Sequence, residues 1–295
     1  MWNFNKKSST ILITLIKLKQ GNNRYEKSAI ATFNFIAILA CLLIISCSQN
    51  TNNSSSQLTT SRINLTISAA ASLKDAMAEI KPIYEQKKTD VSLTLNLASS
   101  GSLRQQIEQG APVDLFISAS PSHMNMLQEK GLIIDKSLRD LLKNKMVLIV
   151  PQENTASINT FQDLTKDTIK TISIGEPKSV PAGKYGQEIL SYLGVYETVK
   201  PKIVFAKNVR QIVNYVTTGN VDAGIVYQTD TKDSSRAKIV ANAPEKSHTP
   251  IVYPMAIIKD SKNIEAAKQL EEFILTPEAK AVFEKYGFIT LNNDD

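Results

Sequence analysis

Strand-like and helix-like segments alternate along the chain from residue 63 onward, and this order constrains the fold more than any other feature. Short apolar runs with strand patterning cover residues 63–69, 91–97, 113–118, 146–150, 171–174, 203–206, 221–227 and 251–258. Apolar residues at helical spacing cover residues 73–84, 103–109, 122–130, 184–193, 209–218, 263–274 and 277–286. Alternation of this kind predicts an α/β fold with parallel sheets and crossover helices.

The alternation restarts after Leu142, which indicates two lobes. We expect the first lobe to comprise residues 62–142 together with residues 251–295, and the second lobe to comprise residues 143–250. In open α/β sheets, ligands bind at the carboxyl ends of the strands, where the following helices also begin. A ligand site is therefore expected in the loops after the strands, in a cleft between the lobes.

Residues 1–47 have the order of a secretory signal peptide. Basic side chains precede an apolar stretch at residues 29–46, and polar residues follow it. Residues 44–47, Ile-Ile-Ser-Cys, are typical of a lipobox, in which Cys47 is lipidated and becomes the new N-terminus. Cys41 also follows a small residue, but processing there would leave two leucines at the mature end. Cys47 is therefore the expected lipidation site.

We expect residues 1–47 to form a signal peptide and residues 48–61, which follow it, to form a flexible polar linker. The body would then be held by an N-terminal lipid in the periplasm or at the extracytoplasmic face of the membrane. The alternative is an uncleaved leader that spans the membrane, because the apolar stretch is just long enough to do so.

Most of the net charge of +6 comes from the leader. Six Lys and Arg and one Glu precede Ser48, so the remaining chain holds 28 basic and 27 acidic side chains. A near-neutral body lacks the basic surface of a nucleic-acid-binding protein. Both cysteines, Cys41 and Cys47, lie in the leader, so the body has none for a disulfide, a thiol nucleophile or a metal cluster. We therefore expect no nucleic-acid partner.

Four loops between predicted strands and helices consist of small, hydroxyl-bearing or turn-forming residues, and each opens a helix. They cover residues 69–73, 98–102, 180–183 and 207–210, with Ser72 expected at a helix N-cap. A helix N-terminus has unpaired N–H groups and a partial positive charge, so several that converge can bind an anion without a cationic side chain. Taken singly, each loop is more often an ordinary cap or turn. Only the four loops taken together indicate an anion-binding site.

The same loops belong to a set of segments that resembles the signature blocks of periplasmic molybdate-binding proteins. The segments are residues 69–73, 98–107, 110–118, 176–183, 208–211, 222–227 and 286–288. The resemblance implies a two-lobe type II periplasmic-binding-protein fold with a ligand cleft between the lobes. It also implies which groups bind the oxyanion. Ser72 and Ser100 would donate from their hydroxyl and N–H groups, Ala182 and Val209 from their backbone N–H groups, and Tyr227 from its phenol.

Neutral donors suit an anion that is fully ionised. Molybdate, tungstate and sulfate offer only acceptors near neutral pH, whereas phosphate keeps a proton that needs an acceptor. None of the matched positions holds Asp or Glu, so we expect phosphate to be rejected, because a buried unpaired donor costs about 1–3 kcal/mol. Preference for molybdate or tungstate over sulfate rests on the resemblance. Molybdenum enters the chemistry only as the oxyanion, and no cofactor is expected.

The resemblance implies a monomeric binding protein that delivers molybdate to an ABC transporter permease with its cytoplasmic ATPase. Other possible functions are a binding protein for another tetrahedral oxyanion such as sulfate, a sensory domain on the same fold, and a serine hydrolase that uses Ser72 or Ser100. A hydrolase needs a base beside the serine, and the chain has two histidines, His123 and His248. Neither serine lies in a Gly-x-Ser-x-Gly motif, so we expect no enzymatic activity.

Charged residues near the loops are expected to have ordinary roles. Asp114 and Asp222 are interpreted as structural hydrogen-bond partners, and the histidines as surface or capping residues. Four cations flank the loops and are interpreted as solvated surface charges that can also steer anions toward the site; they are Lys74, Lys178, Lys184 and Arg210.

Overall fold

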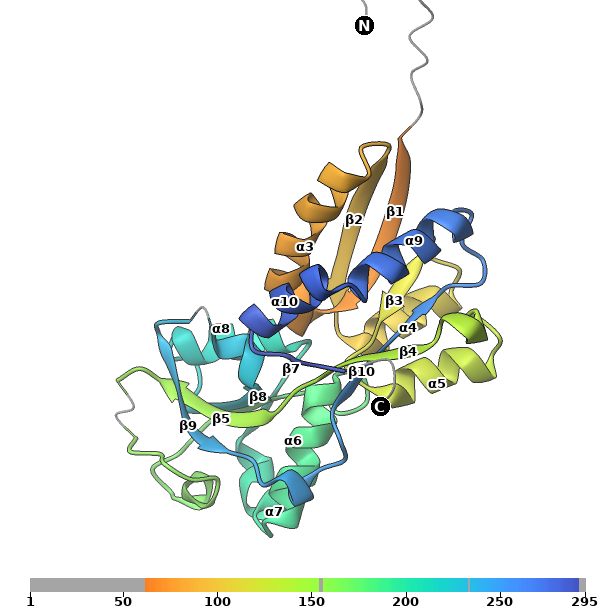
Figure 1. The fold of residues 1–295 in the computed structure, drawn as a ribbon. Coiled ribbons are helices and arrows are strands. Elements are labelled where there is room, and N and C mark those ends of the chain that lie inside the picture. Colours follow the sequence, from red (N-terminus) through yellow and green to blue (C-terminus); the bar gives the residue numbers. More distant parts are fainter. Residues whose placement is uncertain (1–61, 154–155, 233, 292–295) are drawn as a thin grey trace, which may run out of the picture. The chain divides into compact units, whose positions relative to one another are not determined.

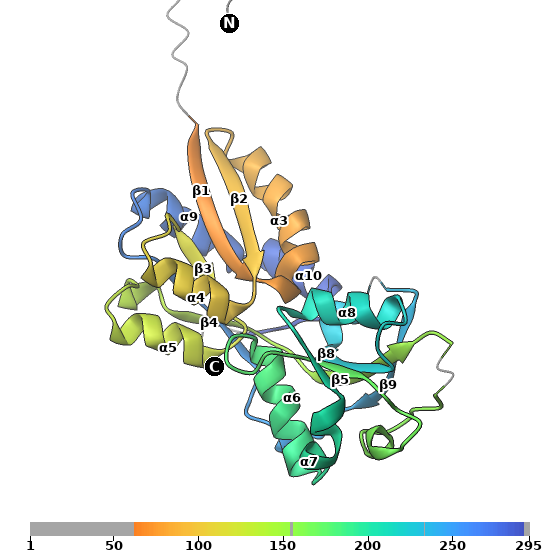
Figure 2. The ribbon, with the colours of Figure 1, turned by 180° about the vertical axis from the view of Figure 1, so that it is seen from behind.

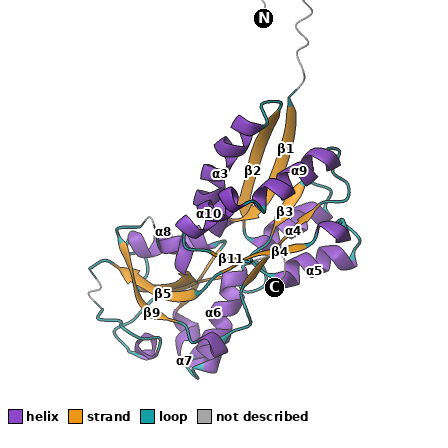
Figure 3. Ribbon diagram, viewed as in Figure 1, coloured by secondary structure: helices purple, strands orange, loops and turns teal. Residues whose placement is uncertain are grey.

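The computed structural model describes residues 62–153, 156–232 and 234–291 (Figure 1). The predicted signal peptide, Cys47 and the linker lie outside these residues. Two sheets, each covered by helices, make up the described chain (Figure 3). Within the described ranges, no helix has the length and apolar character needed to cross a membrane. The α/β class and the two-lobe architecture predicted from the sequence are confirmed.

The first lobe is built on a sheet with the strand order β11-β4-β10-β3-β1-β2. Its strands are β1 (Ile63–Ala70), β2 (Val91–Ala98), β3 (Leu115–Ile117), β4 (Arg139–Lys143), β10 (Val252–Ile257) and β11 (Ile289–Thr290). One face, in front in Figure 1, carries α3 (Lys74–Lys87), α9 (Ile264–Ile274) and α10 (Pro277–Lys285). The other face, in front in Figure 2, carries α4 (Ser100–Glu108) and α5 (Pro121–Glu129).

The second lobe is built on a sheet with the strand order β7-β6-β8-β5-β9. Its strands are β5 (Met146–Pro151), β6 (Ile172–Gly175), β7 (Ile203–Ala206), β8 (Ala223–Tyr227) and β9 (Ala237–Asn242), and its helices are α6 (Pro181–Tyr192), α7 (Tyr196–Val199) and α8 (Val209–Thr217). On β8, Gly224 faces α8 and the next residue, Ile225, faces α6. Because successive strand residues point to opposite faces, α6 and α8 cover opposite sides of this sheet.

The register of the parallel strand pairs brings the loops of the predicted site together. β1 pairs with β2 in parallel so that their last residues, Ala70 and Ala98, lie opposite each other. β6 and β7 likewise end together, at Gly175 and Ala206. The segments that leave these strands therefore start side by side, as expected at the carboxyl edge of a parallel sheet.

The sheets are mixed, which corrects the prediction of parallel sheets. β10 runs antiparallel to β3 and β4, and β5 runs antiparallel to β8 and β9. The chain enters β5 from the first lobe through residues 144–145 and enters β10 from the second lobe through residues 243–251. A strand entered from the other lobe has no crossover helix that would turn it parallel to its neighbours.

Several boundaries also differ from the prediction. The strands β4, β9 and β11 were not predicted, because their exposed or very short sequences lack a clear apolar pattern. Two helices begin earlier than expected. α4 begins at Ser100 because the Ser99 side chain caps it, and α6 begins at Pro181, whose fixed φ suits the first turn of a helix.

Candidate functional site

The four predicted loops meet around one small cavity between the lobes. Residues 70–72, 98–100 and 119 line it from the first lobe, and residues 180–182, 208–209 and 227 line it from the second. All five residues predicted to bind the ligand are in this lining: Ser72, Ser100, Ala182, Val209 and Tyr227. The structure thus brings together every predicted ligand residue, although their binding of a ligand stays a prediction.

The cavity is suited to a very small ligand. The centre of a water-sized sphere can occupy about 10 Å³ of it, which is roughly the space that one water molecule needs. Sites for drug-sized molecules are far larger, at about 300–1,000 Å³. Among the described lining residues there is no charged side chain, so any anion held there would be bound by neutral groups.

Ser72 lies in a 3-10 turn between β1 and α3, and not at the predicted helix N-cap. The turn, η2 (Ala71–Leu73), runs directly into α3, and neither end of it has a side-chain cap. The prediction was wrong because the chain stays helical straight through this serine. Its side chain is buried, and its Oγ lies 3.0 Å from the hydroxyl oxygen of Tyr253 on β10.

Ser100 is the first residue of α4 and is fully buried. Its Oγ accepts a hydrogen bond of 2.9 Å from the backbone N–H of Ala119. A serine hydroxyl that accepts in this way still has its own hydrogen to donate. The preceding residue, Ser99, caps the helix, since its Oγ accepts from the N–H of Ser102 at 3.3 Å.

Ala182 lies in the first turn of α6, whose start is packed tightly against the end of β6. A side-chain carbon added at Gly183 would lie 2.0 Å from the carbonyl oxygen of Gly175, so this close approach requires glycine. Pro181 has no N–H, and the N–H of Gly183 donates to the carbonyl oxygen of Val180 at 2.9 Å, so the N–H that this first turn can offer at the cavity wall is that of Ala182.

Val209 is the first residue of α8. The side chain of Asn208 caps this helix by accepting from the N–H of Gln211 at 3.1 Å. The starts of α4, α6 and α8 thus line one cavity, and together they give it a positive potential from backbone dipoles alone.

Tyr227 ends β8 and is completely enclosed by protein. Its hydroxyl donates a long hydrogen bond of 3.4 Å to the carbonyl oxygen of Ala119 in the other lobe. Its ring packs against those of Tyr185 and Tyr253, with centroid distances of 6.4 and 5.8 Å. Burial raises the pKa of the Tyr227 hydroxyl well above its ordinary value, so the group keeps its proton and remains a donor.

The lobes contact each other directly beside the cavity. The N–H of Gly101 on α4 donates to the carbonyl oxygen of Ser179 at 2.9 Å. A side-chain carbon at Gly101 would lie 2.6 Å from the Ser179 backbone, so glycine permits this contact. The structure therefore describes the two lobes in a closed arrangement around the site.

Arg210 bridges the lobes, which corrects its interpretation as a solvated charge. From α8 its Nε donates to the carbonyl oxygen of Ala71 at 3.2 Å, and its guanidinium pairs with Asp75 of α3. The buried carboxyl of Asp230 lies 3.8 Å from the same guanidinium. Burial raises the pKa of Asp230 to about 7 in spite of the arginine. The other three flanking cations are exposed as expected: Lys74, Lys178 and Lys184.

Comparison with known proteins agrees with this architecture. Residues 65–289 match the bacterial extracellular solute-binding proteins. This chain belongs to that family.

Alignments with individual relatives extend over most of this chain. The chain is 44% identical over 255 residues to YvgL of Bacillus subtilis (strain 168), which is provisionally named an ABC transporter substrate-binding lipoprotein. The match covers 86% of this chain and 96% of that protein. The chain is also 35% identical over 227 residues to the molybdate-binding protein ModA of Haemophilus influenzae, covering 76% and 89%.

A solved structure has the same fold. It is the substrate-binding domain of a provisionally assigned molybdenum ABC transporter from Clostridium difficile, with a TM-score of 0.61 and 46% identity. The match covers 78% of this chain and all of that domain. The type II periplasmic-binding fold expected from the sequence is confirmed.

The histidines of the solute-binding protein do not form a catalytic pair with the site serines. His123 is the third residue of α5, close to the predicted cap position, but it is buried and not at the surface, and burial together with Arg104 lowers its pKa to about 4. The ring of His248 contacts the carbonyl oxygen of Thr249. Over the described residues, no hydrogen bond joins either histidine to Ser72 or Ser100.

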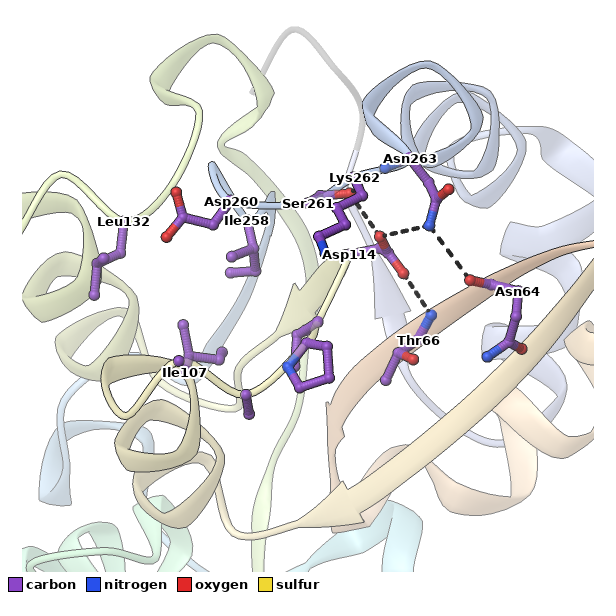
Figure 4. A pocket seen from close by; sticks show the side chains of 14 residues that line it. Asn64, Thr66, Ile107, Asp114, Leu132, Ile258, Asp260, Ser261, Lys262 and Asn263 are labelled. Atoms are coloured by element: carbon purple, nitrogen blue, oxygen red, sulfur yellow. Dashed lines mark hydrogen bonds between the residues drawn. The ribbon is translucent and has the colours of Figure 1, made fainter.

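A larger surface pocket lies against the first lobe, around Asp114 (Figure 4). The carboxylate of Asp114 accepts from the N–H of Thr66 at 2.7 Å, from Ser261 at 2.6 Å and from Asn263 at 3.3 Å. Asp222 similarly accepts from two backbone N–H groups. Both aspartates are structural hydrogen-bond partners, as predicted. In the described part of the chain, no cluster of three or more His, Cys, Asp or Glu side chains could hold a metal ion.

Sequence reasoning missed the polar residues behind the cavity. Tyr253, Asn144 and Asp230 are buried and lie close to Ser72, Tyr227 and Arg210. Asp230 had a usable local signal, since it lies three residues after Tyr227 and accepts from its N–H. Tyr253 had none, because it meets Ser72 across 181 residues of sequence.

Proposed function

We propose that this solute-binding protein captures molybdate, and tungstate as its closest analogue, and delivers it to the permease and ATPase of an ABC transporter. The names of the B. subtilis, H. influenzae and C. difficile relatives support both the transporter and the ligand. The lobes, residues 62–142 with 251–295 and residues 143–250, would close on the anion and present the closed form to the permease.

One observation carries the choice of ligand class. Three helix starts and a 3-10 turn converge on a cavity that has hydroxyl and N–H groups in its described lining but no charged side chain. The donors of such a site suit a compact dianion with only acceptor oxygens, because each oxygen can be met by an N–H or O–H group. The lining must move apart to hold an ion larger than one water molecule. A protonated anion would bring a hydrogen that lacks an acceptor, at a cost of about 1–3 kcal/mol.

Calorimetry on the full-length protein tests the ligand. Molybdate and tungstate are expected to bind tightly, sulfate weakly and phosphate hardly at all. A protein that bound phosphate best would contradict the donor-only site, and one that bound sulfate best would leave the site intact but change the transported anion.

The membrane anchor is a separate part of the proposal, in which Cys47 is lipidated and the body acts as a monomer outside the cytoplasm. Cells that express the full chain are grown with a labelled fatty acid. Label is expected in the wild type and in Cys41→Ser, and is expected to be lost in Cys47→Ser. Equal labelling of both variants would exclude Cys47 as the lipidated residue.

A further inference from the structure

Three buried polar residues that are not in the described cavity lining are linked to Ser72 by hydrogen bonds. Tyr253 lies on β10, Asn144 lies in the segment that joins the lobes, and Thr229 follows β8 in the second lobe. Asn144 donates from Nδ2 to Thr229 Oγ1 at 2.9 Å and to Tyr253 Oη at 3.2 Å. Tyr253 Oη in turn lies 3.0 Å from Ser72 Oγ. The chain of hydrogen bonds therefore ends at a predicted ligand residue.

The orientation of the Asn144 amide is fixed by the backbone. The N–H of Lys145 can only donate, and it lies 2.8 Å from Asn144 Oδ1. The oxygen of the amide is thus held at Lys145, and its NH₂ group must point at Thr229 and Tyr253. The hydroxyl of Tyr253 consequently accepts from Asn144.

The direction of the last hydrogen bond follows. Two hydroxyls lie near the single hydrogen of Tyr253 Oη: that of Ser72, at 3.0 Å, and that of Tyr227, which gives its own hydrogen to Ala119. We assign the Tyr253 hydrogen to Ser72 Oγ, because this pair is at hydrogen-bond distance and the buried tyrosine hydrogen would lose that partner if Ser72 donated instead. Burial raises the pKa of Tyr253 well above its ordinary value, so the hydroxyl keeps this hydrogen. Ser72 therefore accepts from Tyr253, and its own hydrogen is directed elsewhere.

We propose that Tyr253 and Asn144 are positioning residues that hold the Ser72 hydroxyl as a hydrogen-bond donor to the bound oxyanion, and so help the site to reject protonated anions. The inference rests on the proposed function, since it assumes a fully ionised oxyanion in the cavity. Ser100 is held in the same sense by the N–H of Ala119. That donor belongs to the backbone, whereas the Tyr253 donor can be removed by mutation.

The test is the selectivity of Tyr253→Phe in the full-length protein. In the wild type the hydrogen bond from Tyr253 occupies one of the two lone pairs of Ser72 Oγ and fixes the orientation of the hydroxyl. Without the tyrosine hydroxyl, both lone pairs are free and the serine hydroxyl can rotate, so that it can accept the hydrogen of phosphate as well as donate. Calorimetry with molybdate, sulfate and phosphate should show the ratio of molybdate affinity to phosphate affinity falling about tenfold. Sulfate, which is close to phosphate in size but carries no proton, should lose affinity as molybdate does.

Two further variants separate positioning from packing. Tyr84→Phe is the matched control, because Tyr84 is equally buried in the first lobe but its hydroxyl has no hydrogen-bond partner. It should leave every affinity unchanged. In a Ser72→Ala background, Tyr253→Phe should cause no additional change in selectivity, because the tyrosine acts through Ser72. If Tyr253→Phe is too unstable to assay, Asn144→Leu should lower the same ratio.

The outcomes distinguish the two proposals. Equal loss of affinity for all three anions in Tyr253→Phe, or an additive effect in the Ser72→Ala background, would overturn the positioning role alone. Absence of molybdate binding in the wild type would overturn the proposed function. The positioning role would then be tested with whichever fully ionised anion the wild type binds.

Discussion

At the scale of single residues, the phenol of Tyr227 offers the most direct test of the site. Tyr227→Phe removes one donor from the cavity and leaves the packed ring in place. A hydrogen bond to a charged group contributes about 1.5–3 kcal/mol, so molybdate affinity should fall roughly 10- to 150-fold. Calorimetry gives the affinity, and thermal unfolding without anion should change little, because the bond to Ala119 is long. Unchanged affinity would remove Tyr227 from the site.

Two glycines of α6 form a matched pair. Gly183→Ala would place a carbon 2.0 Å from the backbone of Gly175, so the start of the helix must move. Crowding of this kind costs about 1–3 kcal/mol, and both the melting temperature and molybdate affinity should fall. At Gly186 the nearest atom would lie 3.5 Å away, so Gly186→Ala should keep the affinity and leave the melting temperature equal or higher. Equal effects of the two variants would contradict the close approach.

At the scale of secondary-structure elements, Arg210 ties α8 to η2 and α3 across the cleft. Arg210→Met keeps the length of the side chain and removes both inter-lobe contacts. Because the ion pair is partly exposed, its contribution is modest, at about 1 kcal/mol, and the dissociation rate of molybdate should rise about three- to tenfold in stopped-flow competition. Lys184→Met, at an exposed position on α6, is the control. A dissociation rate unaffected by Arg210→Met would show that these contacts do not hold the cleft closed.

The sequence predicted those elements that are determined locally. Apolar spacing located the strands β1, β2, β6 and β8 and their helices, and the residue types in the four loops located the cavity lining. It also located β5 and β10 as strands, but it did not predict that they run antiparallel to their neighbours, since their direction depends on where the chain crosses between lobes. Ser72 was predicted to be a helix N-cap because serine is a common capping residue. Its actual surroundings include Tyr253, which is remote in sequence and could not be inferred locally.

At the scale of the whole molecule, Asp230 makes stability depend on pH. Burial raises its pKa from 3.8 to about 7 in the folded protein. Between these values the folded state holds a proton that the unfolded chain has lost, so its contribution to stability declines as pH rises and is level above about 7. Asp230→Asn removes this titration. Relative to the wild type, the variant should become more stable from pH 5 to 8, by at most about 1.4 kcal/mol per pH unit, in denaturant unfolding. A difference that stays constant with pH would contradict the raised pKa.

The position of β10 in the first sheet has a consequence for biogenesis. This strand lies between β3 and β4, yet it follows the entire second sheet in the sequence. A growing chain that stops before residue 252 can complete every strand of the second sheet, but its first sheet has a gap at the centre, which separates β4 from β3. The N-terminal half must therefore wait for residues synthesised late, and β10, together with the α9, α10 and β11 that follow it, determines when the lobe can fold.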